Sequence, residues 1–157
     1  MFILTCVENK FASLGDIAQI GIAVLTFFVI IIMIWQVRIL KRQLKLNFFS
    51  EYTKRYQEII LHFPENINST DFSFEKLDSK VKDGTMRYMR VYFDLCGEEY
   101  NLNQEEYIEK AIWNYWEDGM KSAFSKKAFK EAWIIIKKDT QYKDEFVKWV
   151  DGIMQKK

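Results

Sequence analysis

The stretch that decides the fold is IAQIGIAVLTFFVIIIMIWQV, residues 17–37, whose 21 residues include no charged side chain. Thirteen of them are isoleucine, leucine, valine or phenylalanine. As a helix rising about 1.5 Å per residue, the stretch is about 31 Å long, which matches the hydrocarbon core of a bilayer. At roughly −0.3 to −0.6 kcal/mol each, these side chains favour insertion by about 4 to 8 kcal/mol. The stretch predicts a transmembrane helix, because the core helix of a soluble protein usually keeps a polar face.

The charges on the two sides of this stretch predict its orientation. Residues 1–16 form a short tail that lacks the basic start of a secretory signal. Four basic residues follow the stretch, and the first acid after it is Glu51. Basic residues next to a span stay in the cytoplasm, so the tail is expected outside and the remainder of the chain inside. Such residues also attract anionic lipid at about 1 kcal/mol each, so two roles stay open, a topology signal or a lipid contact. The four are Arg38, Lys41, Arg42 and Lys45.

Composition narrows the class of protein. The chain has 157 residues, and 23 lysines and arginines nearly balance 22 acids, which argues against a general nucleic-acid binder. Aromatic residues make up 17% against six glycines and one proline, which favours helices with an aromatic core. In the expected topology Cys6 and Cys96 lie on opposite sides of the membrane, so they cannot form a disulfide within one chain. With a single histidine in addition, no zinc site, metal or cofactor is expected.

Apolar spacing predicts the helices after the span. A stripe at intervals of three or four residues favours a helix over 38–63, continuous with 17–37 and ended by Pro64. Residues 64–157 predict helices at about 79–99, 103–119, 125–139 and 142–153. Asn101–Asn103 is expected to be a turn, and Asn103 and Ser125 are expected to be N-caps. The predicted fold is all-α: a transmembrane helix continues into a long amphipathic helix that packs with a cytosolic bundle of about four further helices. Its segments are 1–16, 17–37, 38–63 and 64–157.

The aromatic pattern of the later part of the chain carries a resemblance. Residues 90–99 (RVYFDLCGEE) are followed by Trp113-Asn114-Tyr115-Trp116, then Gly119, Phe129 and Trp133. Together with the basic segment after the span, this pattern resembles a broad group of small bacterial single-pass membrane proteins with a tryptophan-rich helical cytosolic domain. The resemblance covers roughly residues 15–150. It implies a bacterial inner-membrane protein with an all-α domain, and it supplies no catalytic residue.

Three groups of residues are candidates for chemistry. His62 stands at the end of the long helix, where a histidine also stabilises the helix terminus. Residues 94–118 carry a net charge of −7, which suits either a metal site or a solvated, outward-facing surface. Residues 119–138 carry +5, and this basic face is a candidate contact for a partner or a phosphate-bearing ligand. Its natural anion contacts are Lys126, Lys127 and Lys130.

These observations predict a non-enzymatic interaction or scaffold protein anchored in the bacterial inner membrane. Its partner would be another protein or further copies of itself, with no specific nucleic acid involved. An alternative is a membrane-perturbing effector of a bacterial defence or stress system, such as phage defence, whose soluble domain senses a phosphorylated ligand or a partner protein. A third possibility is an enzyme that holds a divalent metal at Glu98 and Glu105.

Overall fold

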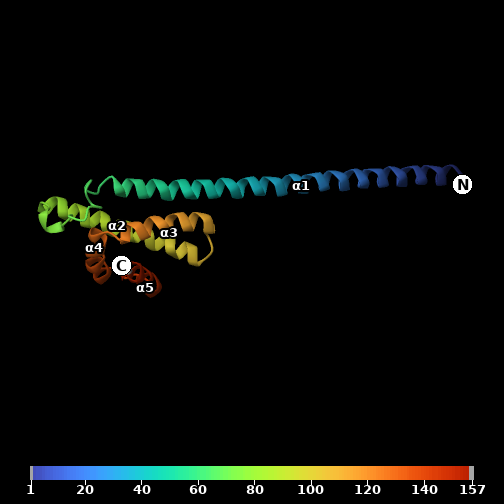
Figure 1. Ribbon diagram of the computed structural model, residues 1–157. Coiled ribbons are helices and arrows are strands. Elements are labelled where there is room, and N and C mark those ends of the chain that lie inside the picture. Colours follow the sequence, from blue (N-terminus) through green and yellow to red (C-terminus); the bar gives the residue numbers. More distant parts are fainter. Residues whose placement is uncertain (1, 156–157) are drawn as a thin grey trace. The chain divides into compact units, whose positions relative to one another are not determined.

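The computed structural model describes the backbone of residues 2–155 and the side chains of residues 16–155. This part of the chain contains five α-helices and no strand, which confirms the all-α prediction (Figure 1). The chain divides into two compact units, Met1–Phe48 and Phe49–Lys157. The α-helices are α1 (Phe2–Ile60), α2 (Ser79–Gln104), α3 (Lys110–Phe124), α4 (Lys127–Asp139) and α5 (Asp144–Gln155), with a short 3₁₀ turn, η1 (Phe74–Lys76), before α2.

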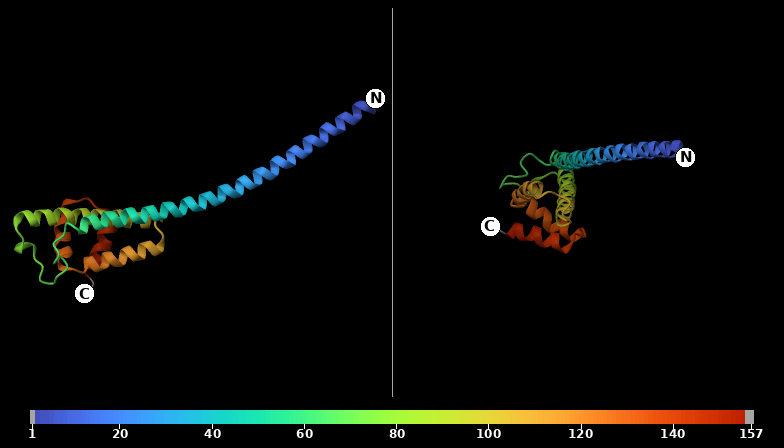
Figure 2. Two further views of the ribbon diagram at one scale, coloured as in Figure 1. Left: turned by 90° about the horizontal axis from the view of Figure 1, so that it is seen from above. Right: turned by 90° about the vertical axis from the view of Figure 1, so that its right-hand side faces the viewer.

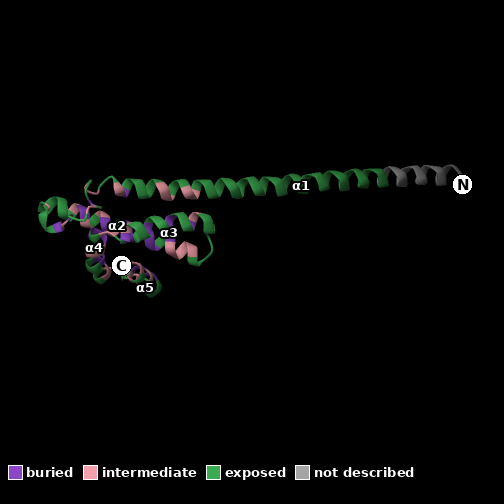
Figure 3. Ribbon diagram, viewed as in Figure 1, coloured by how far each residue is buried: buried purple, intermediate pink, exposed green. Residues whose placement is uncertain are grey.

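Helix α1 contains the apolar stretch 17–37. It begins at Phe2 rather than near Ile17. No proline precedes Pro64, and each of the two glycines in this helix, Gly15 and Gly21, costs only about 1 kcal/mol, so nothing in the sequence stops the helix before residue 17. Every side chain from 16 to 47 is exposed, as the green colour of this part of α1 in Figure 3 shows. Among the described residues, α1 is the one helix long and apolar enough to cross a membrane.

The end of α1 comes three residues earlier than the expected Phe63. The amide of Phe63 bonds to the carbonyl oxygen of Ile60 at 3.0 Å, which is the tighter spacing of a 3₁₀ turn. Pro64 disfavours helical geometry at the residue before it, so the last turn tightens before the proline is reached. Pro64 was therefore the right cause, although the boundary was placed too late.

The segment between α1 and α2 is irregular but well packed. Phe72 and Phe74 are buried, and their rings meet edge to face with centroids 5.0 Å apart. Ile67 is also buried, whereas Leu77 is only half-buried. Asp78 then caps α2 by accepting a hydrogen bond from the amide of Lys80 at 2.9 Å. Apolar side chains thus hold this connection against the helices.

Two expected helix starts are wrong. Residues 101–103, expected to be a turn, lie inside α2, and Glu109 rather than Asn103 precedes α3. Ser125 terminates α3, where its hydroxyl donates to the carbonyl oxygen of Ser122 at 2.7 Å, so it does not cap α4. Lys126 occupies that N-cap position without a side-chain capping bond. The predicted break after Asp139 is confirmed.

Helix α2 ends in a Schellman motif that explains the longer helix. The amide of Tyr107 donates to the carbonyl oxygen of Leu102 at 2.9 Å, and the amide of Glu106 donates to the carbonyl oxygen of Asn103 at 3.0 Å. Glu106 has a φ of 58°, the left-handed conformation for which glycine is usual. A glutamate in this position gave no sequence signal for the end of the helix.

We expect Glu106→Gly to stabilise the folded domain by about 0.5–1 kcal/mol, because glycine adopts a positive φ without steric cost. Thermal unfolding of the full chain in detergent measures the difference. The matched control is Glu105→Gly, since Glu105 has a φ of −85° and should lose stability through added backbone freedom. Equal effects of the two changes would contradict this account of the motif.

The core of the unit 49–157 is built from aromatic rings. Helix α2 packs against α3, α4 and α5, as two further views show (Figure 2). Trp133 of α4 lies 4.8 Å from Phe93 of α2 and 6.0 Å from Phe146 of α5, measured between ring centroids. The Nε1–H of Trp133 donates to Asp151 at 2.7 Å, and this bond satisfies the buried indole. One aromatic cluster therefore joins three helices.

Candidate functional site

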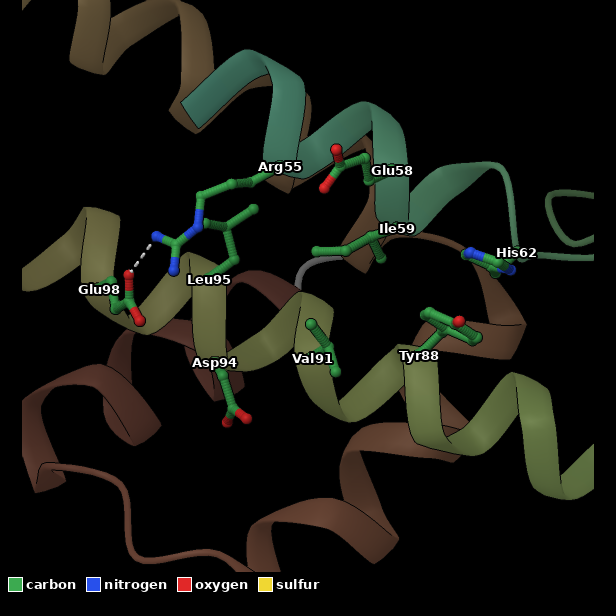
Figure 4. Close-up of a pocket in the computed structure, with 9 residues that line it drawn as sticks. All are labelled: Arg55, Glu58, Ile59, His62, Tyr88, Val91, Asp94, Leu95 and Glu98. Carbon is green, nitrogen blue, oxygen red and sulfur yellow. Dashed lines mark hydrogen bonds and ion pairs between the residues drawn. The ribbon is translucent and has the colours of Figure 1, made fainter. Parts of the chain in front are cut away.

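A polar groove lies between the end of α1 and the middle of α2 (Figure 4). Its volume is about 560 Å³. Arg55 reaches across it, and its Nη1 lies 2.8 Å from Oε2 of Glu98. This ion pair raises the pKa of Arg55, chiefly through the hydrogen bond to Glu98. The groove is lined by Arg55, Glu58, Ile59, His62, Tyr88, Val91, Asp94, Leu95 and Glu98.

His62 lies at one end of this groove, in the turn after α1. Its ring stacks on that of Tyr88, with centroids 3.9 Å apart and planes only 7° apart (Figure 4). The lining residues of the groove include no serine, threonine or cysteine that the imidazole could activate. The geometry is therefore that of a packing contact between the turn and α2.

A second cavity, here named the aromatic pocket, lies within the unit 49–157 and has a volume of about 370 Å³. Three helices contribute rings to its walls. The rings of Tyr52 and Trp116 stack with centroids 5.3 Å apart, and those of Tyr56 and Tyr92 lie 6.2 Å apart. Its lining residues are Tyr52, Thr53, Tyr56, Gln57, Tyr92, Leu95, Cys96, Glu99, Tyr115, Trp116, Asp118, Gly119 and Met120.

Glu99 is the unusual residue of the aromatic pocket. Its exposed fraction is only 6%, and no hydrogen bond or ion pair to its carboxyl is found among the described residues. Burial raises the pKa of Glu99 to about 8, and Glu98 adds to the effect, whereas Arg55 opposes it. At pH 7 this side chain is therefore mostly a neutral carboxylic acid.

One interpretation of the acids in residues 94–118 was a solvated surface that faces outward. Glu99 does not fit this interpretation, because its side chain is buried. Helical spacing explains the difference, because Glu99 stands three, four and seven residues after Cys96, Leu95 and Tyr92, which are all buried. The signal was present in the sequence, since apolar spacing places Tyr92 and either Leu95 or Cys96 on the buried face of this helix. Other acids of the block are exposed: Asp94, Glu98, Glu105, Glu106, Glu109 and Asp118.

The proposed acidic metal site is not assembled in the described part of the chain. Among residues 16–155, no three histidine, cysteine, aspartate or glutamate side chains are placed to hold a metal ion. Glu98 is engaged with Arg55, and Asp94 accepts a hydrogen bond from the hydroxyl of Tyr142 at 2.6 Å. Glu117 is paired with Lys121 at 3.0 Å. Several of these acids thus have structural partners.

The predicted basic residues fall in two places. Arg38, Lys41, Arg42 and Lys45 are exposed on α1, at a spacing that places them on one helix face. In the other unit, Lys126 and Lys130 are half-buried near the start of α4. Lys127 is exposed, and its Nζ lies 3.7 Å from Oε1 of Glu131, so the basic face of α4 carries less free charge than the sequence indicated.

The thiol of Cys96 also lines the aromatic pocket. Burial raises its pKa well above the ordinary value. A protonated thiol is a poor nucleophile, so Cys96 acts as an apolar wall of the pocket.

Comparison of the chain with protein-family models, with curated proteins and with solved structures found no match.

Proposed function

We propose that the chain is a membrane-anchored interaction protein without enzymatic activity. In this proposal α1 crosses the inner membrane of a bacterium, and the unit 49–157 meets its partner in the cytoplasm. The observation that carries the proposal is the exposure of the large apolar side chains along residues 17–37. Water would make such a surface unfavourable, whereas lipid tails solvate it without cost.

The orientation follows from the basic residues of α1. Arg38, Lys41, Arg42 and Lys45 directly follow the apolar stretch, and basic residues near a span remain in the cytoplasm. Their exposure on one helix face also suits contact with anionic lipid headgroups.

Helix α4 supports a role in protein contacts. Ile134 and Ile135 are adjacent and have exposed fractions of 54% and 49%. Lys130 and Lys138 flank Ile134 at one helical turn on either side, so apolar surface lies beside positive charge. Such a surface favours a partner with an apolar and acidic face.

The membrane anchor is tested by a pair of charge substitutions. We expect the wild-type chain to stay in the membrane fraction after an alkaline wash, and Val29→Arg/Ile30→Arg to leave it. Each central arginine costs about 2.5–3.5 kcal/mol, so two remove most of the insertion energy.

The control for this experiment is Leu44→Arg/Leu46→Arg, which adds the same two charges at exposed positions of α1 outside 17–37. It should remain in the membrane. Release of the wild-type chain by the wash, or equal retention of the double variant, would contradict the anchor.

The interaction is tested separately by cross-linking of the full chain in native membranes. A product larger than one chain is expected, and Ile134→Ser/Ile135→Ser should reduce its yield several-fold. Val81→Ser, an equally exposed position on α2, serves as the control and should leave the yield unchanged. A chain that cross-links to nothing would refute the interaction while leaving the anchor intact.

A further inference from the structure

The aromatic pocket has the charge of a cation site. Glu99 and Asp118 are acids in its wall, and its lining residues include no lysine, arginine or histidine. The cation that lowers the pKa of Glu99 is Arg55, whose Nη1 lies 2.8 Å from Oε2 of Glu98. An anion would meet two acids without a countercharge in the wall, so the pocket favours a positively charged ligand.

The walls favour an organic cation over a metal ion. Five of the lining residues are tyrosine or tryptophan, and the apolar side chains of Leu95 and Met120 also line the pocket. Aromatic rings attract ammonium groups by about 0.5–2 kcal/mol each, whereas metal ions need several oxygen or nitrogen ligands. The volume of about 370 Å³ is at the small end of the range for ligand pockets.

Glu99 offers what such a ligand requires. Its side chain is more than nine-tenths buried and lines the pocket, and no hydrogen bond or ion pair to it is found among the described residues. Since none of these residues has a fully buried side-chain oxygen without a partner, the carboxyl oxygens of Glu99 keep contact with the space of the pocket. A buried carboxyl group of this kind is costly unless something compensates it. We propose that the aromatic pocket binds a small organic ammonium ion, with Glu99 as the counter-ion and with tyrosine and tryptophan rings around the cation. This inference does not depend on the membrane anchor.

Binding is coupled to the release of a proton. The raised pKa of about 8 means that Glu99 must ionise to pair with the cation. For a permanently charged ligand, affinity should therefore rise about 20-fold from pH 6.5 to pH 8.5 and level off above that range. The charged and titratable groups around Glu99 are Tyr52, Arg55 and Tyr56 of α1, Tyr92, Cys96 and Glu98 of α2, and Tyr115 and Asp118 of α3.

Neighbouring groups do not provide the same pH dependence. Burial raises the pKa of Tyr52, Tyr56 and Tyr92 above that of ordinary tyrosine, and it raises that of Cys96 well above the usual thiol value. These four groups stay neutral between pH 6.5 and pH 8.5, and Arg55 stays charged.

The test uses choline and its neutral isostere 3,3-dimethylbutan-1-ol. Both are titrated by calorimetry into the full chain, which is held in a maltoside detergent because a choline-headed detergent would compete. We expect choline to bind at pH 8.5 at least ten times more tightly than the isostere, and about 20-fold more weakly at pH 6.5. Equal binding of the two probes, or no binding of choline at pH 8.5, would overturn the proposal.

Variants assign the effect to the pocket. Glu99→Gln should lose the preference for choline and its pH dependence, while Glu58→Gln removes an exposed acid outside the pocket and should bind as the wild type does. Tyr115→Leu should weaken choline several-fold without harm to the fold, since the side chain of Tyr115 is 71% exposed. Pocket variants that bind choline with the wild-type pH profile would refute the assignment.

Discussion

At pH 8, Glu99→Gln is expected to be more stable than the wild-type chain by about 3 kcal/mol, whereas at pH 4 it is expected to be less stable by about 1 kcal/mol. The pKa of Glu99 is about 8 in the folded chain, against an ordinary value of 4.5. Well below pH 4.5 the group is protonated in both states, so its ionisation contributes nothing, and only the cost of burying the amide of the variant remains. Between pH 4.5 and pH 8 only the unfolded state ionises, so the folded state loses about 1.4 kcal/mol per pH unit.

Over this range the wild-type chain loses about 4–5 kcal/mol of its free energy of unfolding, and Glu99→Gln does not. The cost of burying an amide in the same place, which applies at every pH, reduces the expected gain of the variant at pH 8 to about 3 kcal/mol. Tryptophan fluorescence during thermal unfolding of the full chain in non-ionic detergent measures it. Glu58→Gln should follow the wild-type chain within about 0.5 kcal/mol at both pH values. A wild-type chain that keeps its stability from pH 5 to pH 8 would rule out the buried neutral acid.

Truncation of Trp133 to alanine is expected to destabilise the unit 49–157 by about 3–5 kcal/mol, the usual cost of removing a large aromatic side chain from a core. The exposed fraction of Trp133 is 1%. Its ring contacts Phe93 at 4.8 Å and Tyr142 at 5.4 Å, so the change opens a cavity between α2, α4 and the start of α5. It also removes the donor to Asp151.

For a domain of about this size, the loss lowers the unfolding temperature by more than about 10 °C. Trp35→Ala is the matched control, because Trp35 lies in the apolar stretch of α1 with an exposed fraction of 63%. It should leave the unfolding of the other unit unchanged. A loss below about 1 kcal/mol for Trp133→Ala would show that the aromatic cluster is not the core of this unit.

The sequence predicted the helices well and their ends less well, for physical reasons. Periodicity indicates which face of a helix is buried, and Trp116, Phe129 and Trp133, which it assigns to buried faces, are buried. Tyr107, which it assigns to the same stripe as Trp116, is 76% exposed. Helix ends depend on a few backbone bonds. At the end of α2 the decisive residue is Glu106, whose positive φ is set by the Schellman bonds and not by its side chain.

The aromatic pocket was less predictable from the sequence than the helices were. Tyr52, Tyr56, Tyr115 and Trp116 occur at helical spacing in apolar stripes, which predicts that they face a core, although Tyr115 is 71% exposed. Whether neighbouring helices close completely over such rings depends on how α1, α2 and α3 pack, and a single sequence does not contain that information. The position of Glu99 on the buried face was readable from its spacing, but the charge of its neighbours suggested a solvated surface.

The ring cluster around Trp133 has a spectroscopic consequence. Rings held at defined mutual angles, such as 18° between Phe93 and Phe124, give a chiral environment to electronic transitions in the near ultraviolet. Loss of that packing would remove the near-ultraviolet circular dichroism while the far-ultraviolet signal of the helices persists, which is the signature of a molten globule. This domain therefore carries an intrinsic optical probe that separates a loosened core from an unfolded chain.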